Sequence, residues 1–372
     1  MRFEEKADDL STLVVVSLLS GTPIEFKYDK INRTRLPKTH NDILKFVKLI
    51  SPNSVYEAKL HDNSEFILKF DPGQLEGGKL EFHANSNICL SILIRIMFQI
   101  CIFCKNPTSI RLFGRIASKN SPSVDFMRLS TLPFVSEFLE LDPNDIVLKI
   151  IRKSITDNPA GEVLVKIPIV SKIKAKQLEE IGLIKKIRGI SWSLNIPPEI
   201  SLRSIKSFKD VICKHSTNVH IATNFSRDTI SKSNPNPGQA FSLIVYAESE
   251  NSKRICAEKI FVSFDNKAEF DPEELGKVSA YELLHKIYTR SYIDEFNSSI
   301  ALVYMALSEN HVSIISLPQL CLEGKYLLRY LNMFFNQKFS LKTTQPCDES
   351  NVQQYKLSCL GNGFVNYNRI LY

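Results

Sequence analysis

Apolar residues recur along the chain with two periods, one typical of helices and one typical of strands. The segment 40–50, "HNDILKFVKLI", has helical spacing, whereas 54–73 reads as two strands around a polar turn. The segment 87–104, "NICLSILIRIMFQICIFC", is apolar almost throughout but carries Arg95 and Gln99 in its middle. A central arginine costs about 3 kcal/mol in a bilayer, so this segment predicts a helix buried in a soluble core rather than a membrane span.

The residues that follow continue this mixture of short elements. Strands are expected at 109–116, 145–155 and 161–170, and a helix is expected at 123–139. Such an alternation is typical of helices that cover one face of mainly antiparallel sheets. The predicted fold class is therefore α+β.

The texture of the sequence changes near residue 184, where a second and smaller pattern begins. Its elements are a helix at 201–215 and strands at 219–225, 240–249 and 254–264, around the loop-like stretch 226–239. The larger pattern then resumes with a helix at 271–288. We therefore expect a core made of 1–183 and 277–372, with 184–276 inserted as a smaller α/β domain.

Composition and cysteine placement narrow the class of protein. At 372 residues, with 44% apolar and 23% charged residues, the chain is long enough for a large core and two domains. The eight cysteines have no disulfide or zinc spacing, and the C-x-x-C pair Cys101 and Cys104 lies inside an apolar run. The N-terminal "MRFEEKADD" has two bases and four acids, the wrong sign for a signal peptide. We expect an intracellular, soluble protein without a bound metal.

Positive charge is concentrated in one part of the chain. The whole chain has a net charge of +7, and residues 149–188 alone contain ten basic residues against four acidic ones. Such a block can contact either RNA, through its phosphate groups, or a partner protein, but a solvated surface has the same composition. The candidate contact residues in this block are Arg152, Lys153, Lys172, Lys174, Lys176, Lys185, Lys186 and Arg188.

Motifs for nucleotide binding and hydrolysis do not occur in the sequence. P-loop, Rossmann, H-E-x-x-H and nucleophile-elbow patterns are absent, and the seven histidines lie in unrelated contexts. Asp125 in "PSVDF" and Asp294 in "YIDEF" carry groups that bind metals, but such residues more often cap helices or form structural pairs.

The segment 317–335, "LPQLCLEGKYLLRYLNMFF", predicts a helix whose entrance carries Glu323. Free backbone N–H groups and the positive end of the dipole make a helix entrance suitable for an anion or a nucleophile. Glu323 is therefore a catalytic group, the trace of a lost one, or a residue that stabilises the entrance by about 0.3–1 kcal/mol through the dipole.

Several short motifs occur in the order found in one known family. They include "LSGTP" (19–23), "DPGQLEGG" (71–78), "SPSVDFMRLSTLPFVSEF" (121–138), "IKKIRGISWSLNIPPEI" (184–200), "IDEFNSSIALVYMAL" (293–307) and "SCLGNGFVN" (358–366). With this collinear order the chain resembles the RNA 3′-terminal phosphate cyclases, and especially the cyclase-like branch that takes part in ribosome assembly. The resemblance implies a core of repeated βαβαββ units and an inserted thioredoxin-like α/β domain, which here lacks a C-x-x-C.

The resemblance also gives Glu323 a meaning. Active cyclases attack ATP with a histidine just before a helix, and counting from the match at Val312–Ser313 places that position at Glu323. A carboxylate cannot replace the imidazole, because it would form a mixed anhydride and would repel the triphosphate. His311, the nearest histidine, would need a shift of twelve residues. The resemblance thus implies a protein that is not an enzyme and uses no cofactor.

Other phosphate-binding positions of the family have changed as well. "TRLP" (34–37) lacks the family's arginine at that register, although Arg35 and Lys38 lie close and are further candidate contacts for RNA. "PAG" (159–161) stands where the family has three glycines, and "FGRI" (113–116) stands where it has "GGTN". An apolar framework that persists without this chemistry favours a scaffold.

By this resemblance the chain is expected to be a non-catalytic assembly factor for the small ribosomal subunit. It would act in early pre-rRNA processing in the nucleolus, within the small-subunit processome. Expected partners are a ribosome-assembly GTPase, the small nucleolar RNP and pre-rRNA, with no membrane and no small-molecule substrate. One alternative is a pre-rRNA endonuclease that uses Asp125, Asp294 and Arg329. A working RNA 3′-terminal phosphate cyclase is the third hypothesis.

Overall fold

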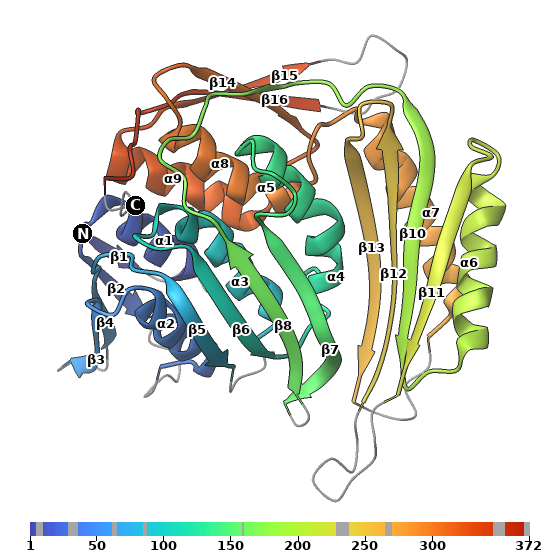
Figure 1. The fold of residues 1–372 in the computed structure, drawn as a ribbon, viewed down its shortest axis with the longest axis horizontal. Helices are drawn as coiled ribbons and strands as arrows, with labels where there is room; N and C mark the ends of the chain where they lie inside the picture. Colours follow the sequence, from blue (N-terminus) through green and yellow to red (C-terminus); the bar gives the residue numbers. More distant parts are fainter. Residues whose placement is uncertain are drawn as a thin grey trace, which may run out of the picture.

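Four separate sheets, each of four strands, organise the part of the chain that the structure describes. In the computed structural model the described residues are 1–4, 10–28, 36–61, 65–84, 88–157, 160–227, 238–264, 270–344 and 354–367. Helices and mixed sheets alternate along these segments, so the α+β class expected from the sequence is confirmed (Figure 1).

Three of the sheets belong to units with the same order of elements, β-α-β-α-β-β. The first unit has β1 (Arg2–Glu4), α1 (Leu10–Ser20), β2 (Ile24–Tyr28), α2 (Lys38–Ile50), β3 (Val55–His61) and β4 (Glu65–Asp71). The second has β5 (Gly78–His83), α3 (Leu90–Ile100) with η1 (Cys101–Phe103), β6 (Thr108–Gly114), the helix α4–η2–α5 (Val124–Phe126, Met127–Thr131, Leu132–Phe138), β7 (Val147–Asp157) and β8 (Ala160–Ile167). The third has β9 (Gln177–Leu178), η3 (Glu295–Asn297), α8 (Ser298–Leu307), β14 (Val312–Leu317), α9 (Leu322–Phe335), β15 (Phe339–Thr344) and β16 (Gln354–Leu360).

The pairing of strands repeats with the elements. The order β1-β2-β4-β3 of the first sheet recurs as β5-β6-β8-β7 and as β9-β14-β16-β15. In each sheet the first two strands are parallel and the other neighbours are antiparallel. A single topology therefore accounts for the whole core outside the inserted unit.

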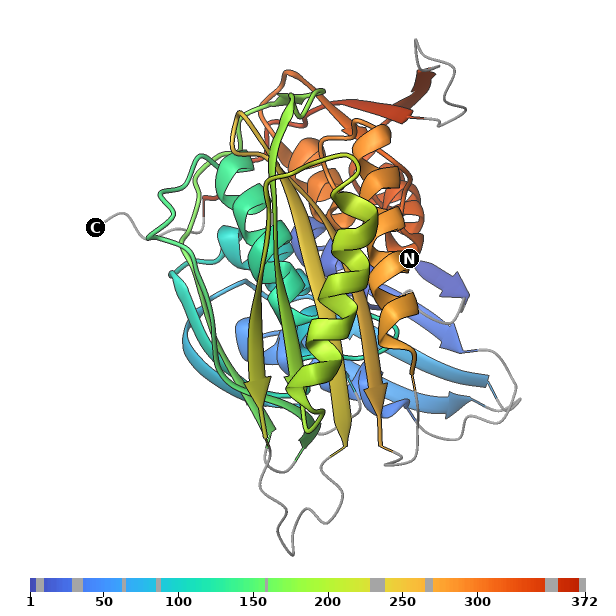
Figure 2. The same cartoon turned by 90° about the vertical axis from the view of Figure 1, so that its right-hand side faces the viewer.

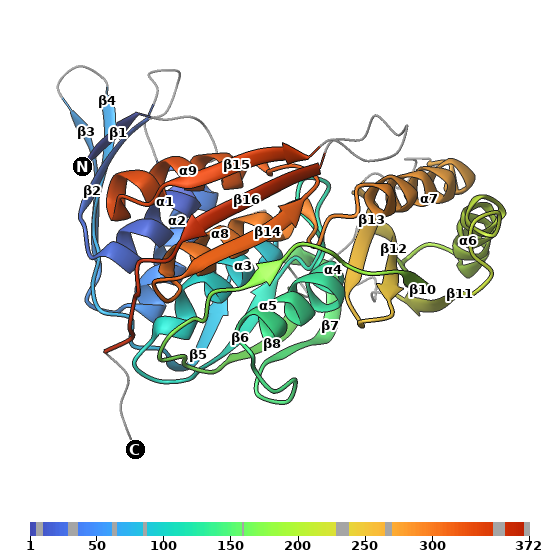
Figure 3. The ribbon, with the colours of Figure 1, turned by 90° about the horizontal axis from the view of Figure 1, so that it is seen from above.

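The helices of the three units pack together inside the core, and the sheets lie around them (Figures 1 and 3). Helix α8 is buried along its whole length, and α1 is buried except at Ser20. Helices that are apolar all round require burial on every side, which the packing among α1, α3, α8 and α9 provides. Within the described residues, no helix is both long enough and apolar enough to cross a membrane.

The inserted unit forms the fourth sheet and carries two helices of its own. Its elements are β10 (Ile184–Leu194), α6 (Pro198–Ile212), β11 (Val219–Ser226), β12 (Gln239–Ser249), β13 (Arg254–Ser263) and α7 (Pro272–Tyr288). Figure 2 shows α6 and α7 over one face of the sheet, and the other face is turned to the core. In β12, Phe241, Leu243 and Val245 pack in the cluster under these helices, whereas Ala240 and Ile244 belong to the main core.

The far boundary of the inserted unit differs from the expected one at residue 276. That position lies inside α7, which is continuous from Pro272 to Tyr288. Ala280 and Leu283 of this helix belong to the hydrophobic cluster of the inserted unit. The unit therefore extends to the end of α7, because the second half of this helix covers the sheet as the first half does.

Candidate functional site

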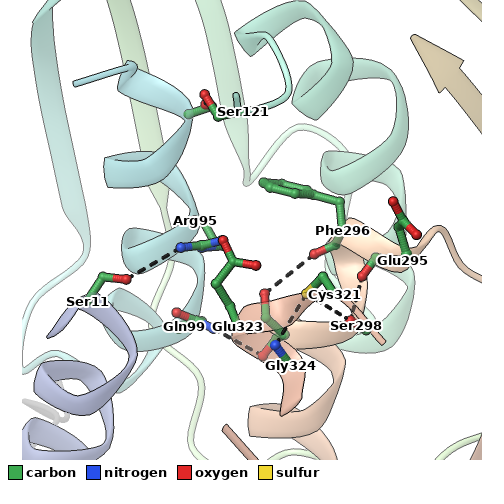
Figure 4. Close-up of polar contacts among 12 residues, drawn as sticks. Ser11, Arg95, Gln99, Ser121, Glu295, Phe296, Ser298, Cys321, Glu323 and Gly324 are labelled. Atoms are coloured by element: carbon green, nitrogen blue, oxygen red, sulfur yellow. Dashed lines mark hydrogen bonds and ion pairs between the residues drawn. The ribbon is translucent and has the colours of Figure 1, made fainter. Parts of the chain in front are cut away.

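Helix α9 begins where the sequence predicts a helix entrance, and a thiol caps it. Cys321 is the N-cap, and its Sγ accepts a hydrogen bond from the backbone N of Gly324 at 3.3 Å. The Oγ of Ser298 lies 3.3 Å from the same sulfur. Glu323 follows in the first turn, so its carboxylate lies at the positive end of the helix dipole (Figure 4).

An ion pair with Arg95 holds the Glu323 side chain. The Nη1 atom of Arg95, on α3, donates to Oε1 of Glu323 at 2.8 Å. The arginine side chain is 5% exposed and that of the glutamate is 31% exposed, so the pair lies at the edge of the core. Nη2 of Arg95 also donates a long hydrogen bond to Oγ of Ser11 on α1, and the guanidinium lies 5.7 Å from the centre of the Phe296 ring.

The electrostatics of the pair keep the Glu323 carboxyl ionised. Burial alone would raise its pKa, but the charge of Arg95 and the hydrogen bond from Arg95 outweigh burial, and the pKa is lowered. The pKa of the neighbouring Cys321 thiol is raised, first by burial and then by the negative charge of Glu323. The entrance of α9 thus presents a carboxylate fixed on a guanidinium beside a neutral thiol.

Asp125, predicted as a possible metal ligand or nuclease residue, is buried in an ion-pair cluster. Its Oδ2 accepts from Nζ of Lys153 at 2.5 Å and its Oδ1 accepts from Nη2 of Arg128 at 2.9 Å. The Asp125 side chain is 1% exposed. Nζ of Lys153 lies 4.9 Å from the ring centre of Trp192 in the inserted unit, so this cluster connects the core with the insertion.

Asp294, the second such candidate, is equally buried. Its Oδ2 accepts from Oγ of Ser130 at 2.5 Å, and its Oδ1 accepts from the backbone N of Cys256 at 3.2 Å. Nζ of Lys286 lies 3.8 Å from Oδ1. Burial raises the pKa of Asp294, although the charge of Lys286 acts in the opposite direction. Both aspartates therefore have structural partners for their oxygens and are not open to solvent.

Arg329 and His311 lie away from these carboxylates and from the α9 entrance. Arg329 is exposed on α9, whereas Asp125 and Asp294 are buried where the inserted unit meets the core. His311 precedes β14, and α9 begins beyond the other end of this six-residue strand, which extends about 20 Å. In the described segments, no three His, Cys, Asp or Glu side chains are grouped so that they could hold a metal ion.

The candidate basic residues are spread over several elements. Lys172, Lys174 and Lys176 lie in and beside the segment that leads to β9, and the remaining members of the block lie on β7 and β10. Most of them have local partners: Lys153 with Asp125, Lys172 with Glu309, Lys174 and Lys176 with Glu140, Lys186 with Glu248, Arg152 with the Ala160 carbonyl, and Arg188 with Asn218. Lys185 is exposed on β10 and Lys38 at the start of α2. Arg35 lies outside the described residues.

The residue that the sequence argument missed as a member of the site is Arg95. In the sequence Arg95 argues against a membrane span, and, because a charge inside an apolar helix requires a partner of opposite charge, it also indicates an acidic contact. Gln99, one turn further along α3, similarly donates to the backbone O of Ser299 at 3.0 Å. The lone arginine in 87–104 was thus a signal for an acidic partner, but no sequence spacing identified Glu323, which is 228 residues away.

Comparisons with known proteins agree with the resemblance. A family model described as RNA 3′-terminal phosphate cyclase matches residues 7–341. The RNA 3′-terminal phosphate cyclase-like protein of Mus musculus is 29% identical over 364 residues, which cover 96% of this chain and 95% of the relative. The rRNA processing protein rcl1 of Schizosaccharomyces pombe is 26% identical over 97% of this chain and 95% of the relative. The RNA 3′-terminal phosphate cyclase of Pyrobaculum aerophilum is 24% identical over 89% of this chain and 90% of the relative.

Among solved structures, the EPSP synthase of Acinetobacter baumannii aligns with a TM-score of 0.24 and 9% identity. The alignment covers 97% of this chain and 65% of that one.

Removing one charge of the Arg95–Glu323 pair should destabilise the fold, whereas removing both should not. Glu323→Gln leaves the buried guanidinium without an anion, and we expect the free energy of unfolding to fall by about 1–3 kcal/mol. This is less than for a fully buried pair because Glu323 is partly exposed. Arg95→Met together with Glu323→Leu should lie within about 1 kcal/mol of the wild type. Urea unfolding followed by circular dichroism measures this cycle, and a double variant less stable than Glu323→Gln would contradict it.

The pair should also make stability depend on pH in the acid range. Because the folded pKa of Glu323 is lowered, its stabilisation is complete above the unfolded pKa of about 4.3 and is lost as the pH falls through the folded value. The stability difference between the wild type and Glu323→Gln should therefore stay constant at neutral pH and shrink as the pH falls below about 5. Urea midpoints at several pH values provide the measurement. Glu57→Gln, at a carboxylate that is 55% exposed, serves as the control and should change little at any pH.

Proposed function

The chain belongs to the RNA 3′-terminal phosphate cyclase family, and from this premise we propose that it is a non-catalytic assembly factor for the small ribosomal subunit. In this proposal it acts in early pre-rRNA processing in the nucleolus, within the small-subunit processome. Its partners are a ribosome-assembly GTPase, the small nucleolar RNP and pre-rRNA.

The printed names of relatives support a role in rRNA processing but do not decide it alone. The Schizosaccharomyces pombe relative is named as an rRNA processing protein, and the mouse relative is named cyclase-like. A relative named for the cyclase itself also matches. The choice between processing without catalysis and RNA cyclisation therefore depends on the residues of this chain.

The observation that carries the proposal is the ion pair at the entrance of α9. A nucleotide acceptor must be nucleophilic and must tolerate a triphosphate beside it. At the position that the resemblance assigns to this acceptor, Glu323 is ionised and bound to Arg95 at 2.8 Å. The adjacent Cys321 is occupied as the helix cap, and its pKa is raised. The acceptor position is thus occupied by a carboxylate that is already held in an ion pair, which supports a function performed by surfaces rather than by group transfer.

The description of the inserted unit as thioredoxin-like belongs to the same proposal. Its strand order β11-β10-β12-β13 supports it, with one parallel pair followed by antiparallel pairs and with two helices on one face. The unit has no C-x-x-C pair: Cys213 is exposed beyond α6, and Cys256 is buried in β13. We therefore assign the unit a structural or binding role and no dithiol chemistry.

Absence of nucleotidyl transfer can be tested directly on the purified chain. Incubation with α-labelled ATP and Mg²⁺, followed by denaturing gel electrophoresis without an acid step, should leave no label on the protein, because Glu323 offers no neutral nucleophile. The archaeal cyclase named above provides the positive control. Label that persists in His311→Ala and disappears in Glu323→Gln would overturn the proposal.

The assembly role can be separated from catalysis in cells. Depletion of the protein should cause unprocessed pre-rRNA to accumulate, as measured by northern hybridisation. The Arg95→Met/Glu323→Leu variant should restore processing fully, because both charges have a structural role only. The tagged wild-type protein should co-purify with a GTPase and with small nucleolar RNP proteins. Failure of the double variant, at wild-type protein levels, would assign a chemical role to the α9 entrance and contradict the proposal.

A further inference from the structure

The outward face of the second core sheet has an unusual set of side chains. Inward residues of its strands, such as Ile110, Leu112, Val163 and Val165, are fully buried. The alternate positions point away from the helices, which lie on the other side of this sheet (Figures 1 and 2). The strand registers place these outward residues in three rows across β5, β6, β8 and β7. The rows are Lys79–Ser109–Lys166–Val147, Glu81–Arg111–Leu164–Lys149 and His83–Phe113–Glu162–Arg152.

Positive charge dominates this outward face. Five basic side chains share it with two acidic ones, which leaves three uncompensated positive charges. The basic residues are Lys79, Arg111, Lys149, Arg152 and Lys166, and all five are exposed. In the described part of the chain none of Lys79, Arg111, Lys149 and Lys166 forms an ion pair. Glu81, which lies beside Arg111 in the register, contacts His83 at 3.0 Å instead. Four exposed cations on one sheet therefore have their charges available to a partner.

An aromatic pair lies at one end of the same face. The rings of His83 and Phe113 are stacked, with centroids 4.3 Å apart and an angle of 5° between their planes. These two residues are directly opposite each other on the parallel strands β5 and β6. Arg111 precedes Phe113 by two residues, so it lies on the same face of β6. A flat, partly exposed aromatic surface next to free cations can bind a base and its phosphates together.

The equivalent face of the first sheet lacks these features, although the topology is the same. On β2, β4 and β3 the outward residues include Lys27, Lys59 and Lys69, which are balanced by Glu25, Glu57 and Asp71. Lys69 lies between Glu25 and Glu57 in the register, and Lys59 pairs with Glu57 at 2.5 Å. The surplus charge of the second sheet is thus not a consequence of the fold.

We propose that the outward face of β5, β6, β8 and β7 binds single-stranded RNA, with phosphates on Arg111, Lys166, Lys79 and Lys149 and an unpaired base on the His83–Phe113 stack. This inference rests on the proposed function, for which it names the RNA-contacting surface. The aromatic stack favours RNA over an acidic peptide, and it favours single strands over duplexes because paired bases cannot present a face for stacking.

RNA binding by matched variants of the full chain tests the proposal. The probe is a fluorescein-labelled 20-nucleotide single-stranded RNA of mixed sequence, titrated with protein at several salt concentrations. Arg111→Gln/Lys166→Gln should weaken binding at least about tenfold. The plot of the logarithm of the binding constant against the logarithm of the salt concentration should become less steep by about 1.4, because two phosphate contacts are lost. Phe113→Leu should weaken binding at least about fivefold and leave the slope unchanged, because only stacking is lost.

The control variant is Lys59→Gln/Lys69→Gln, which removes two charges from the outward face of the first sheet. It should bind RNA within about twofold of the wild type. All variants change exposed or partly exposed positions, and their thermal melting should match the wild type. If Lys59→Gln/Lys69→Gln lost as much RNA affinity as Arg111→Gln/Lys166→Gln, the proposal would be overturned, because the RNA would then be attracted by net charge alone. Polyglutamate that displaces RNA equally from wild type and Phe113→Leu would overturn it in favour of an acidic protein partner.

The same variants in depleted cells distinguish this inference from the proposed function. If wild-type protein restores pre-rRNA processing but binds the RNA probe no better than Arg111→Gln/Lys166→Gln, the inference fails and the proposed function stands. If depletion leaves pre-rRNA processing unchanged, the proposed function fails regardless of the binding data. Loss of both RNA binding and processing in Arg111→Gln/Lys166→Gln, with the control variant intact, supports the inference.

Discussion

A guanidinium buried in an apolar helix must be neutralised where it lies, and here this requirement relates three units of the core to one another. Arg95 belongs to α3, its anion Glu323 to α9, and its third contact Ser11 to α1. These helices come from three different units of the core. Because an unpaired buried charge costs several kcal/mol, the pair specifies how the second unit lies against the third more sharply than apolar packing alone does. Gln99 adds a contact from α3 to α8 with the same effect.

A similar principle describes how the inserted unit is attached. Glu258 of β13 accepts hydrogen bonds from the backbone N of Ser123 and from Oγ of Ser242, and burial raises its pKa. Asp125 and Asp294 are buried at the same junction with cations and donors around them. Asp294 and Glu258 have partners both in the core and in the inserted unit. Asp125 acts less directly, by holding Lys153, whose Nζ lies 4.9 Å from the Trp192 ring of the inserted unit. This explains why Asp125 and Asp294 stand out in the sequence although neither is accessible to a substrate.

The sequence predicted the elements with strong periodicity and missed contacts between distant segments. The local pattern predicts the helices at 40–50 and 201–215, because the residues of each apolar face lie within one short segment of the chain. The change in pattern near residue 184 is local in the same sense. The end of the insertion could not be predicted in this way, since α7 is one uninterrupted helix across residue 276. The partner of Arg95 required tertiary structure, because nothing local relates α3 to a residue 228 positions later. The segment 149–188 is one basic block in the sequence, but it folds onto separate sheets, where most of its basic residues have local partners.

The three equivalent sheets separate the part of the sequence that the fold requires from the part that it leaves free. Most inward positions of the three units are apolar, because they cover the same helical interior. Outward positions have no such constraint. On the first sheet their lysines are balanced by neighbouring carboxylates. Like charges gathered on one face slightly destabilise a sheet, so the surplus on the second sheet has no structural benefit. The RNA that we propose as the partner of this face would account for the surplus, because its phosphates would neutralise the four exposed cations.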